Sequence, residues 1–333
     1  DAYIRPPELH DELVARFGEF PLFQYWGPTA AIASTQWIAE STRHIMRTQA
    51  PDLLMAYLPH LDYDLQRFGP SHPRAAAAAA ELDAALVPLL GEAVSRGYAV
   101  IAVSEYGIEE AHLPVDINRV LRREGLLEVY VQDGKEQLDT WTSRAFAVAD
   151  HQVAHVYVSN PGDVARTAAI LKETSGVDEV LDRNAQAKYG LDHERSGELV
   201  VIAEPGAWFT YYFWLDDARA PEYARGVDIH RKPGYDPSEL FFNPEDRLAK
   251  AKAGLNLVRK KAGLRYAMST VPLDARHVRG THGRLPGSRE STPLVISSEQ
   301  AMPPFAEELM RLGKQIPAAA VKSLVLQTQG LPE

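Results

Sequence analysis

LLMAYL at residues 53–58 and YAVIAV at residues 98–103 are the two apolar runs that decide the fold. Each run is six residues long, which suits a strand that is buried on both faces of a sheet. Between them, residues 72–96 carry apolar side chains at helical spacing, including Leu82, Leu86 and Leu89. Strand, long helix and strand in this order predict a parallel βαβ unit with a right-handed crossover.

Polar segments follow both predicted strands, at residues 59–70 and 104–112. In open parallel sheets, ligands bind beyond the carboxyl ends of the strands, so we expect Asp62 and Glu105 to face one crevice. Carboxylates with a nearby histidine are suitable ligands for zinc or manganese. A polar loop whose aspartate caps the next helix is an equally good explanation of the first segment.

Two later segments carry histidine beside basic residues. GTHGRLP at residues 280–286 brackets His282 with glycines, so His282 could bind a metal and Arg284 a phosphate. In DIHRKPGYDP at residues 228–237, Asp228 and His230 would point to the same side of an extended segment, beside Arg231. A flexible surface loop and an ordinary Asp–His pair are the competing interpretations.

The middle of the chain predicts a second structural unit. Short strands are expected at residues 144–148, 155–158, 199–203 and 208–214, with a helix at 163–174. We therefore predict an α+β cap at residues 127–235, inserted into an α/β core formed by residues 1–126 and 236–333. The aromatic run at 208–214 could stack a base or a sugar, but alternating aromatic residues more often belong to a core or an interface.

Composition narrows the classes of function. The 333 residues include no cysteine, which excludes disulfides, thiolate nucleophiles and iron–sulfur clusters. With 35 Lys and Arg against 45 Asp and Glu, the net charge of −10 argues against a nucleic-acid surface. We see no apolar run long enough to span a membrane and no signal peptide. Cytoplasmic location is the default expectation, and a processed exported form stays open.

Taken in order, three of these segments resemble the alkaline phosphatase superfamily, and most closely its type I phosphodiesterase/nucleotide pyrophosphatase family. That family carries Asp-x-x-x-His-x-Tyr-Gly-Pro, then Ser-Asp-His-Gly-Met, then Thr-His-Gly. The matching stretches here are Asp62–Pro70, Ser104–Ile108 and Thr281–Gly283. The resemblance implies a largely parallel central sheet flanked by helices, with the inserted cap setting specificity.

This sequence departs from the family at two metal positions. Gln66 stands where the family has a histidine, and Glu105-Tyr106 replaces the family's Asp-His pair. His282 keeps the last ligand. The resemblance implies Asp62, Glu105 and His282 as metal ligands, and we hypothesise that Asp228 and His230 compensate for the lost histidines. The polar residues expected around these ligands are Gln66, Tyr106, Arg284 and Arg231.

The resemblance also implies the chemistry. Family members hydrolyse phosphodiester, phosphomonoester or pyrophosphate bonds with divalent metal ions, here expected to be zinc or manganese, on a small phosphate ester or nucleotide-like substrate. The family's first strand and its nucleophile have no counterpart in this sequence, so we expect a preceding segment to supply them. The alternative is a non-catalytic binding or interaction relative, favoured by Gln66 and Tyr106. A homo-oligomer stays open.

Overall fold

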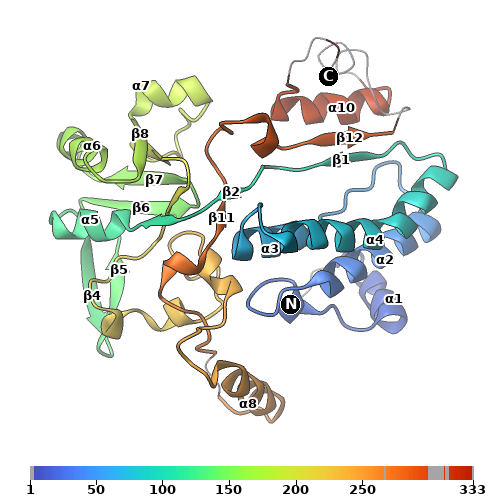
Figure 1. The fold of residues 1–333 in the computed structure, drawn as a ribbon, viewed down its shortest axis with the longest axis horizontal. Coiled ribbons are helices and arrows are strands. Elements are labelled where there is room, and N and C mark those ends of the chain that lie inside the picture. Colours follow the sequence, from blue (N-terminus) through green and yellow to red (C-terminus); the bar gives the residue numbers. More distant parts are fainter. Residues whose placement is uncertain (1–3, 266–267, 299–310, 312–314, 332–333) are drawn as a thin grey trace.

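A computed structural model describes residues 4–265, 268–298, 311 and 315–331 (Figure 1). These residues form a mixed α/β structure. The α-helices are α1 (Pro7–Phe17), α2 (Ile32–Thr48), α3 (His60–Phe68), α4 (Pro73–Ser95), α5 (Ile117–Arg123), α6 (Val164–Lys172), α7 (Arg183–Gln186), α8 (Ala249–Lys261) and α10 (Val321–Thr328). The strands are β1 (Ile101–Val103), β2 (Glu109–Glu110), β3 (Leu113–Val115), β4 (Glu128–Gln132), β5 (Lys135–Asp139), β6 (Ala145–Asp150), β7 (Val153–Val158), β8 (Val177–Leu181), β9 (Leu199–Ala203), β10 (Ala207–Phe209), β11 (Gly280–Thr281) and β12 (Val295–Ser297).

The elements gather in two parts joined near β2 and β11 (Figure 1). One part contains the antiparallel sheet β6-β7-β9-β8 with α5, α6 and α7, and the other contains α1 to α4 with β1, β12 and α10. The short pair β2–β11 is antiparallel, with Thr281 opposite Glu109. Chain segments far apart in sequence therefore meet at the junction.

The largest hydrophobic core lies around the four-stranded sheet. The aromatic run at residues 208–214 is part of it, and each of its side chains is at most 2% exposed. This run therefore packs the core and does not offer a stacking surface to a base or a sugar. The same core extends past the expected cap boundaries, since it includes Ile117 on one side and Val278 on the other. The domain boundaries at 127 and 235 stay a prediction.

The expected parallel central sheet is not found among the described residues. Their sheets are antiparallel except for the two-stranded pair β3–β10, and β1 pairs with β12 in antiparallel register. The run at residues 53–58 forms no strand, and Leu53, Met55 and Tyr57 are more than half exposed. A continuous apolar run becomes a buried strand only where neighbouring strands pair with it, and the described residues supply no such neighbour.

Helix boundaries agree closely with the sequence signals. Helix α1 begins beside Pro7 and ends at Gly18, whose φ of 75° favours glycine. Helix α4 begins after His72, whose imidazole accepts a hydrogen bond from the backbone N–H of Arg74 at 3.1 Å. None of the described helices is both long and apolar enough to cross a membrane.

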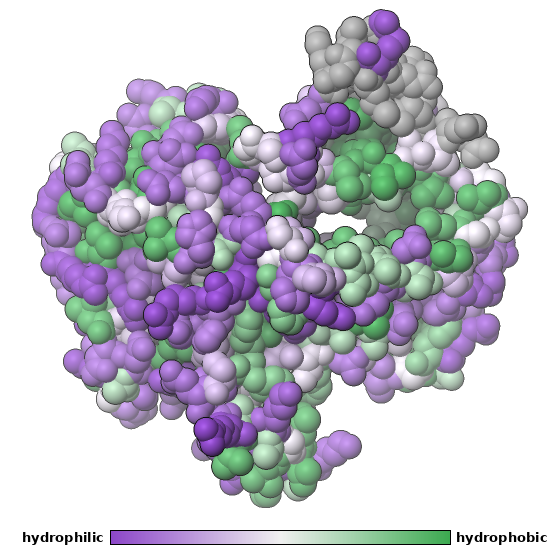
Figure 2. All heavy atoms as spheres, viewed as in Figure 1, coloured by the Kyte–Doolittle hydropathy of each residue, from purple (hydrophilic) through white to green (hydrophobic). Residues whose placement is uncertain are grey.

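The space-filling view shows an opening in the part of the molecule that contains α3 and α4, between these helices and the β1–β12 pair (Figure 2). Apolar side chains border this opening on the side of β1 and β12. In that part of the chain, Val103 of β1 and Ile296 of β12 are 44% and 62% exposed. The cavity discussed below lies near the junction, where α3 approaches the loops after β10.

Candidate active site

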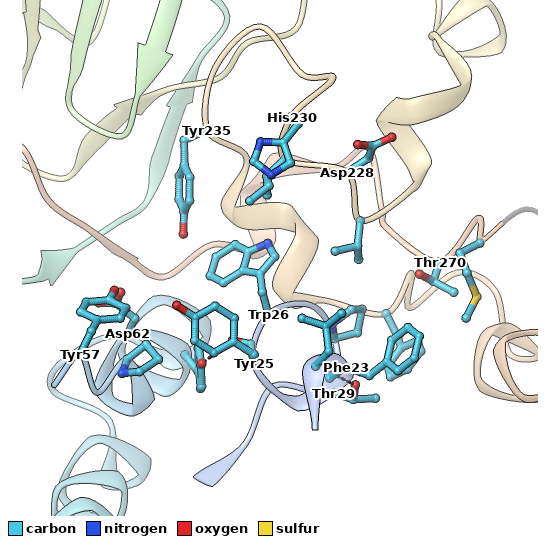
Figure 3. A pocket seen from close by; sticks show the side chains of 18 of the residues that line it. Phe23, Tyr25, Trp26, Thr29, Tyr57, Asp62, Asp228, His230, Tyr235 and Thr270 are labelled. Atoms are coloured by element: carbon cyan, nitrogen blue, oxygen red, sulfur yellow. Dashed lines mark hydrogen bonds between the residues drawn. The ribbon is translucent and has the colours of Figure 1, made fainter. Parts of the chain in front are cut away.

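A cavity of about 900 Å³ gathers most of the residues that the sequence singled out. Asp62, Glu105 and His282, from the three family-like segments, all line it. Asp228 and His230 reach the same cavity from the loop that precedes Tyr235 (Figure 3). All five predicted ligands thus line the same cavity, and the metal-binding role of each stays a prediction.

Asp62 lies on a helix and not on the loop expected there. Helix α3 begins after Pro59 and ends at Gly69, and four of its residues are buried. Asp62 and Gln66 are four residues apart, so they lie on the same face of this helix. Gln66 is fully buried, and its amide makes no hydrogen bond of normal geometry with the described residues.

Tyr106 links two of the predicted ligands. Its hydroxyl donates a hydrogen bond to Oδ2 of Asp62 at 2.8 Å, and its ring stacks on the His282 imidazole. The ring centroids are 3.6 Å apart and the ring planes differ by 8°. His282 is stacked on Tyr106 and also contacts the His151 ring, at a centroid distance of 4.0 Å. The phenol therefore contacts a carboxylate and an imidazole at the same time.

The position of His282 follows from the pairing of β2 with β11. The backbone N–H of Gln152 donates to the carbonyl of His282 at 2.9 Å, which ties the strand end to the turn between β6 and β7. His151 is fully buried, and its Nδ1 lies 3.2 Å from the hydroxyl of Thr281. A Cβ added at Gly280 would lie 2.1 Å from the carbonyl oxygen of Leu65 in α3. Glycine is therefore required for β11 to approach the helix that carries Asp62.

Burial shifts the acid–base properties of the cavity. It raises the pKa of Asp62 to about 6, while the Tyr106 hydrogen bond lowers it and the charge of Glu105 adds to the increase. Burial lowers the pKa of His282 to about 4, so its imidazole is neutral at pH 7. Burial and the nearby charge of Glu105 also raise the pKa of Asp150, another lining residue. The cavity thus combines a carboxyl group that holds its proton unusually well with a neutral imidazole.

Aromatic side chains form much of the remaining wall. Phe23, Tyr25 and Trp26 come from the segment before α2, and Tyr57 lies beside Asp62 (Figure 3). The rings of Trp26 and Tyr235 are 5.4 Å apart. Burial raises the pKa of Tyr57 to about 12, and the charge of Asp62 contributes, so this phenol stays neutral. The wall offers a mainly apolar surface to the part of a ligand that does not react.

A buried ion cluster positions this aromatic wall. Lys232 is within 2.7 Å of both Asp236 and Glu239. Glu239 also accepts hydrogen bonds from the Trp26 indole at 2.6 Å and from the backbone N–H of Asp228 at 2.9 Å. One buried carboxylate therefore fixes both the indole and the start of the loop that carries His230.

The two arginines predicted near the phosphate do not line the cavity. The Arg284 guanidinium donates to the carbonyl of Ala203 at 2.8 Å and lies 3.3 Å from Asp178. Arg231 is largely exposed and stacks over the ring of Tyr223. Arg284 follows the glycine turn and is drawn toward the end of β9, whereas Arg231 leaves the loop on its outer side. The described lining contains no lysine or arginine.

The donors as arranged do not fit a divalent metal ion. Among the residues that the structure describes, no three histidine, aspartate or glutamate side chains form a group that could hold one. One oxygen of Asp62 accepts a hydrogen bond from the Tyr106 hydroxyl, and the His282 imidazole packs against the Tyr106 ring. The ligand set implied by the resemblance is therefore not assembled into a metal site in the described residues.

Sequence reasoning missed the aromatic wall and the ion cluster that supports it. The dense aromatic segment FPLFQYWGP at residues 20–28 was the available signal for the wall. Lys232 follows Arg231 in the sequence, yet it is only 6% exposed and pairs with two carboxylates. The sequence holds no sign of which carboxylates meet it, because Glu239 lies on a separate turn.

A cavity with carboxylates, a neutral imidazole and an apolar wall is typical of enzymes and ligand-binding proteins that act on small molecules. The family model for type I phosphodiesterase / nucleotide pyrophosphatase matches residues 1–236, and the chain belongs to this family. No curated protein sequence matches it.

Solved structures similar to this chain include two hydrolases. Phosphonoacetate hydrolase from Sinorhizobium meliloti 1021, in complex with phosphonoformate, is 18% identical with a TM-score of 0.41, and the match covers 57% of this chain and 45% of that one. An inactive murine ectonucleotide pyrophosphatase / phosphodiesterase 5, in complex with AMP, is 13% identical with a TM-score of 0.39, covering 54% and 45%. The chain thus spans less than half the length of these proteins.

Proposed function

We propose that this chain carries the substrate cavity of a hydrolase that cleaves phosphodiester, phosphomonoester or pyrophosphate bonds in a small molecule. The observation that supports this most is the convergence of three family-like segments on one cavity, through Asp62, Glu105 and His282. Membership of the type I phosphodiesterase family supports the same class of reaction. The aromatic wall would hold the group attached to the phosphate.

The polar residues of the cavity can exchange protons or form hydrogen bonds. Asp62 holds a proton more readily than an ordinary aspartate, so near pH 6 it can exchange one with a reacting group. His282 is neutral and can accept a hydrogen bond. Tyr106 donates to Asp62 and orients it. The nucleophile is not assigned to any residue of this chain.

The proposed cofactor is a divalent ion, zinc or manganese, as expected from the sequence. The described lining has no lysine or arginine, so it offers a phosphate little positive charge. A divalent ion would supply that charge when bound. Because the donors do not fit an ion as arranged, metal dependence has to be measured directly.

A second candidate is a non-catalytic relative that binds a small molecule in the same cavity. The specific observation in its favour is the placement of Tyr106, whose hydroxyl donates a hydrogen bond to Asp62 and whose ring covers one face of the His282 imidazole. Such a protein would bind its ligand through the aromatic wall without turning it over.

The experiment is a hydrolysis assay with the full-length protein, treated with a chelator and then supplied with zinc, manganese or neither. The substrates are bis(para-nitrophenyl) phosphate, para-nitrophenyl phosphate and inorganic pyrophosphate, one for each bond class. We expect turnover of at least one, with Asp62→Asn reducing the rate and the exposed Asp192→Asn leaving it unchanged. Ligand binding without turnover under any metal would support the non-catalytic candidate instead.

A further inference from the structure

We propose that helix α8 binds the surface of a membrane that contains anionic lipids, and that it lies along this surface through an outward apolar stripe bordered by basic side chains. The helix spans Ala249–Lys261 and projects from the rest of the molecule (Figure 1). This inference goes beyond the proposed function, because it concerns an outer surface of the protein and not the reaction in the cavity.

The segment around α8 is strongly basic in an acidic chain. Residues 247–265 contain seven of the 35 lysines and arginines and no aspartate or glutamate, whereas the whole chain has a net charge of −10. Arg247, Arg259 and Lys261 are exposed and have no ion-pair partner among the described residues. A local cluster of free positive charge attracts an anionic surface even when the net charge of the chain is negative.

An apolar stripe runs along the outward face of α8. Leu248, Leu255 and Val258 are 61%, 60% and 62% exposed, and Ala251 and Ala262 are exposed as well. In chain order these five residues follow one another at intervals of three, four, three and four positions, so they lie on one face of the helix. This face therefore offers a continuous apolar strip to whatever lies against it.

Basic side chains border the stripe along both edges. Lys252 and Arg259 each directly follow a stripe residue in the sequence, whereas Lys250 and Lys261 each directly precede one. Because each residue advances about 100° around a helix, the two pairs lie on opposite edges of the stripe. Long basic side chains can then reach lipid headgroups while the apolar residues between them enter the boundary with the acyl chains.

The inner face of α8 is already packed, and this favours a flat binding surface. Ala249 is 3% exposed, and Ala253 and Leu257 line the cavity. A partner protein that encloses a helix would have to displace α8 from the cavity, whereas a membrane needs only the outward face. Exposed leucine and valine contribute nothing to contacts with a nucleic-acid backbone, so their alignment between basic residues favours lipid.

The test is flotation of the full-length protein with two kinds of vesicle, phosphatidylcholine alone and phosphatidylcholine with about 30 mol% phosphatidylserine, at low and at high salt. The double variant Leu255→Gln/Val258→Gln removes the centre of the stripe, and Arg259→Gln/Lys261→Gln removes two charges. A labelled DNA duplex is titrated in parallel. Thermal unfolding of each variant establishes that it is folded.

The matched control is Val87→Gln/Val94→Gln on helix α4, since these two valines are 60% and 64% exposed. Their exposure equals that of the stripe residues, but they lie on a different helix. This control should bind both kinds of vesicle as wild type does, which would show that an exposed apolar side chain elsewhere on the protein has no such role.

We expect wild type to bind the anionic vesicles at least about tenfold more tightly than the neutral ones, and high salt to weaken this binding. Each α8 double variant should bind the anionic vesicles about tenfold more weakly than wild type. No binding to either kind of vesicle, equal binding to both kinds, unchanged binding by the α8 variants, or binding of DNA without binding of vesicles would each overturn the proposal. Because the assay measures binding and not turnover, its outcome is independent of whether the protein hydrolyses phosphate esters.

Discussion

At the scale of single residues, the buried cluster around Lys232 links stability to the shape of the cavity. Its ammonium neutralises two carboxylates that are themselves buried, Asp236 and Glu239. Breaking a buried ion pair by removing one partner leaves an uncompensated charge, which is strongly destabilising.

We therefore expect Lys232→Met to lower the free energy of unfolding by about 3–5 kcal/mol, measured by urea denaturation. Tryptophan fluorescence should change as well, because Glu239 holds the Trp26 indole. Lys252→Met is the matched control, since Lys252 pairs with Asp246 on the surface, and it should cost less than about 1 kcal/mol. Similar losses in the two variants would show that the buried cluster has no special role.

His155 on β7 gives a prediction about pH. Burial lowers its pKa below the usual 6.5, and its Nδ1 accepts a hydrogen bond from the backbone N–H of Gly197 at 3.2 Å. When the folded pKa of a histidine is lowered, the unfolded chain takes up the proton first as the pH falls. The stability contributed by neutral His155 is therefore present above pH 6.5 and is lost as the pH falls below it.

We expect wild type to lose up to about 1 kcal/mol more stability than His155→Gln between about pH 7.5 and about pH 5.5. Urea denaturation of both proteins at the two pH values measures this difference. An equal or greater loss in His155→Gln would contradict the assignment.

At the scale of elements, the approach of β11 to α3 sets the distance between two of the cavity's chemical groups. His282 directly follows β11, and Asp62 lies on α3. Only a glycine fits at Gly280, because a side chain there would collide with the backbone of Leu65.

Gly280→Ala should therefore cost about 1–3 kcal/mol of unfolding free energy, as overpacking typically does. Gly287→Ala is the control, because an added Cβ there meets no atom within 4 Å, and it should change stability by less than about 0.5 kcal/mol. Denaturation midpoints measure both. Equal changes in unfolding free energy in the two variants would contradict the close contact between β11 and α3.

Local signals predicted the helices better than the sheets. The helices expected at residues 72–96 and 163–174 correspond to α4 and α6, whose ends lie within two residues of those bounds. Strand β1 lies within the predicted run at residues 98–103, but its partner is β12, almost 200 residues away and antiparallel. Strand partners depend on contacts between distant segments, which the apolar pattern of one segment does not encode.

Helix α3 was missed for a different reason. Its polar residues suggested a ligand-binding loop, yet Asp62 and Gln66 are spaced as neighbours on one helical face. The spacing that marks the family motif was thus a helix signal too. Proline before the segment and glycine after it were the available boundary signals.

At the scale of the whole molecule, the chain builds one cavity from segments spread between residues 22 and 282. The sequence predicted that Asp62, Glu105 and His282 would converge, because their order matches a known family. It could not predict the aromatic wall or the placement of Arg231 and Arg284 outside the cavity, since these depend on how distant loops pack. The chain carries a net charge of −10, and the described lining of the cavity is acidic as well, with carboxylates but no lysine or arginine.

The central claim is that this cavity carries out phosphate-ester hydrolysis. The most direct test is the initial rate of para-nitrophenol release from bis(para-nitrophenyl) phosphate by full-length wild type and by His282→Gln, with the same metal supplement. We predict that the variant retains at most about one hundredth of the wild-type rate, which is the loss expected if His282 contacts the reacting atoms as proposed. Equal rates in the two proteins, or no turnover by wild type with zinc or manganese, would contradict the claim.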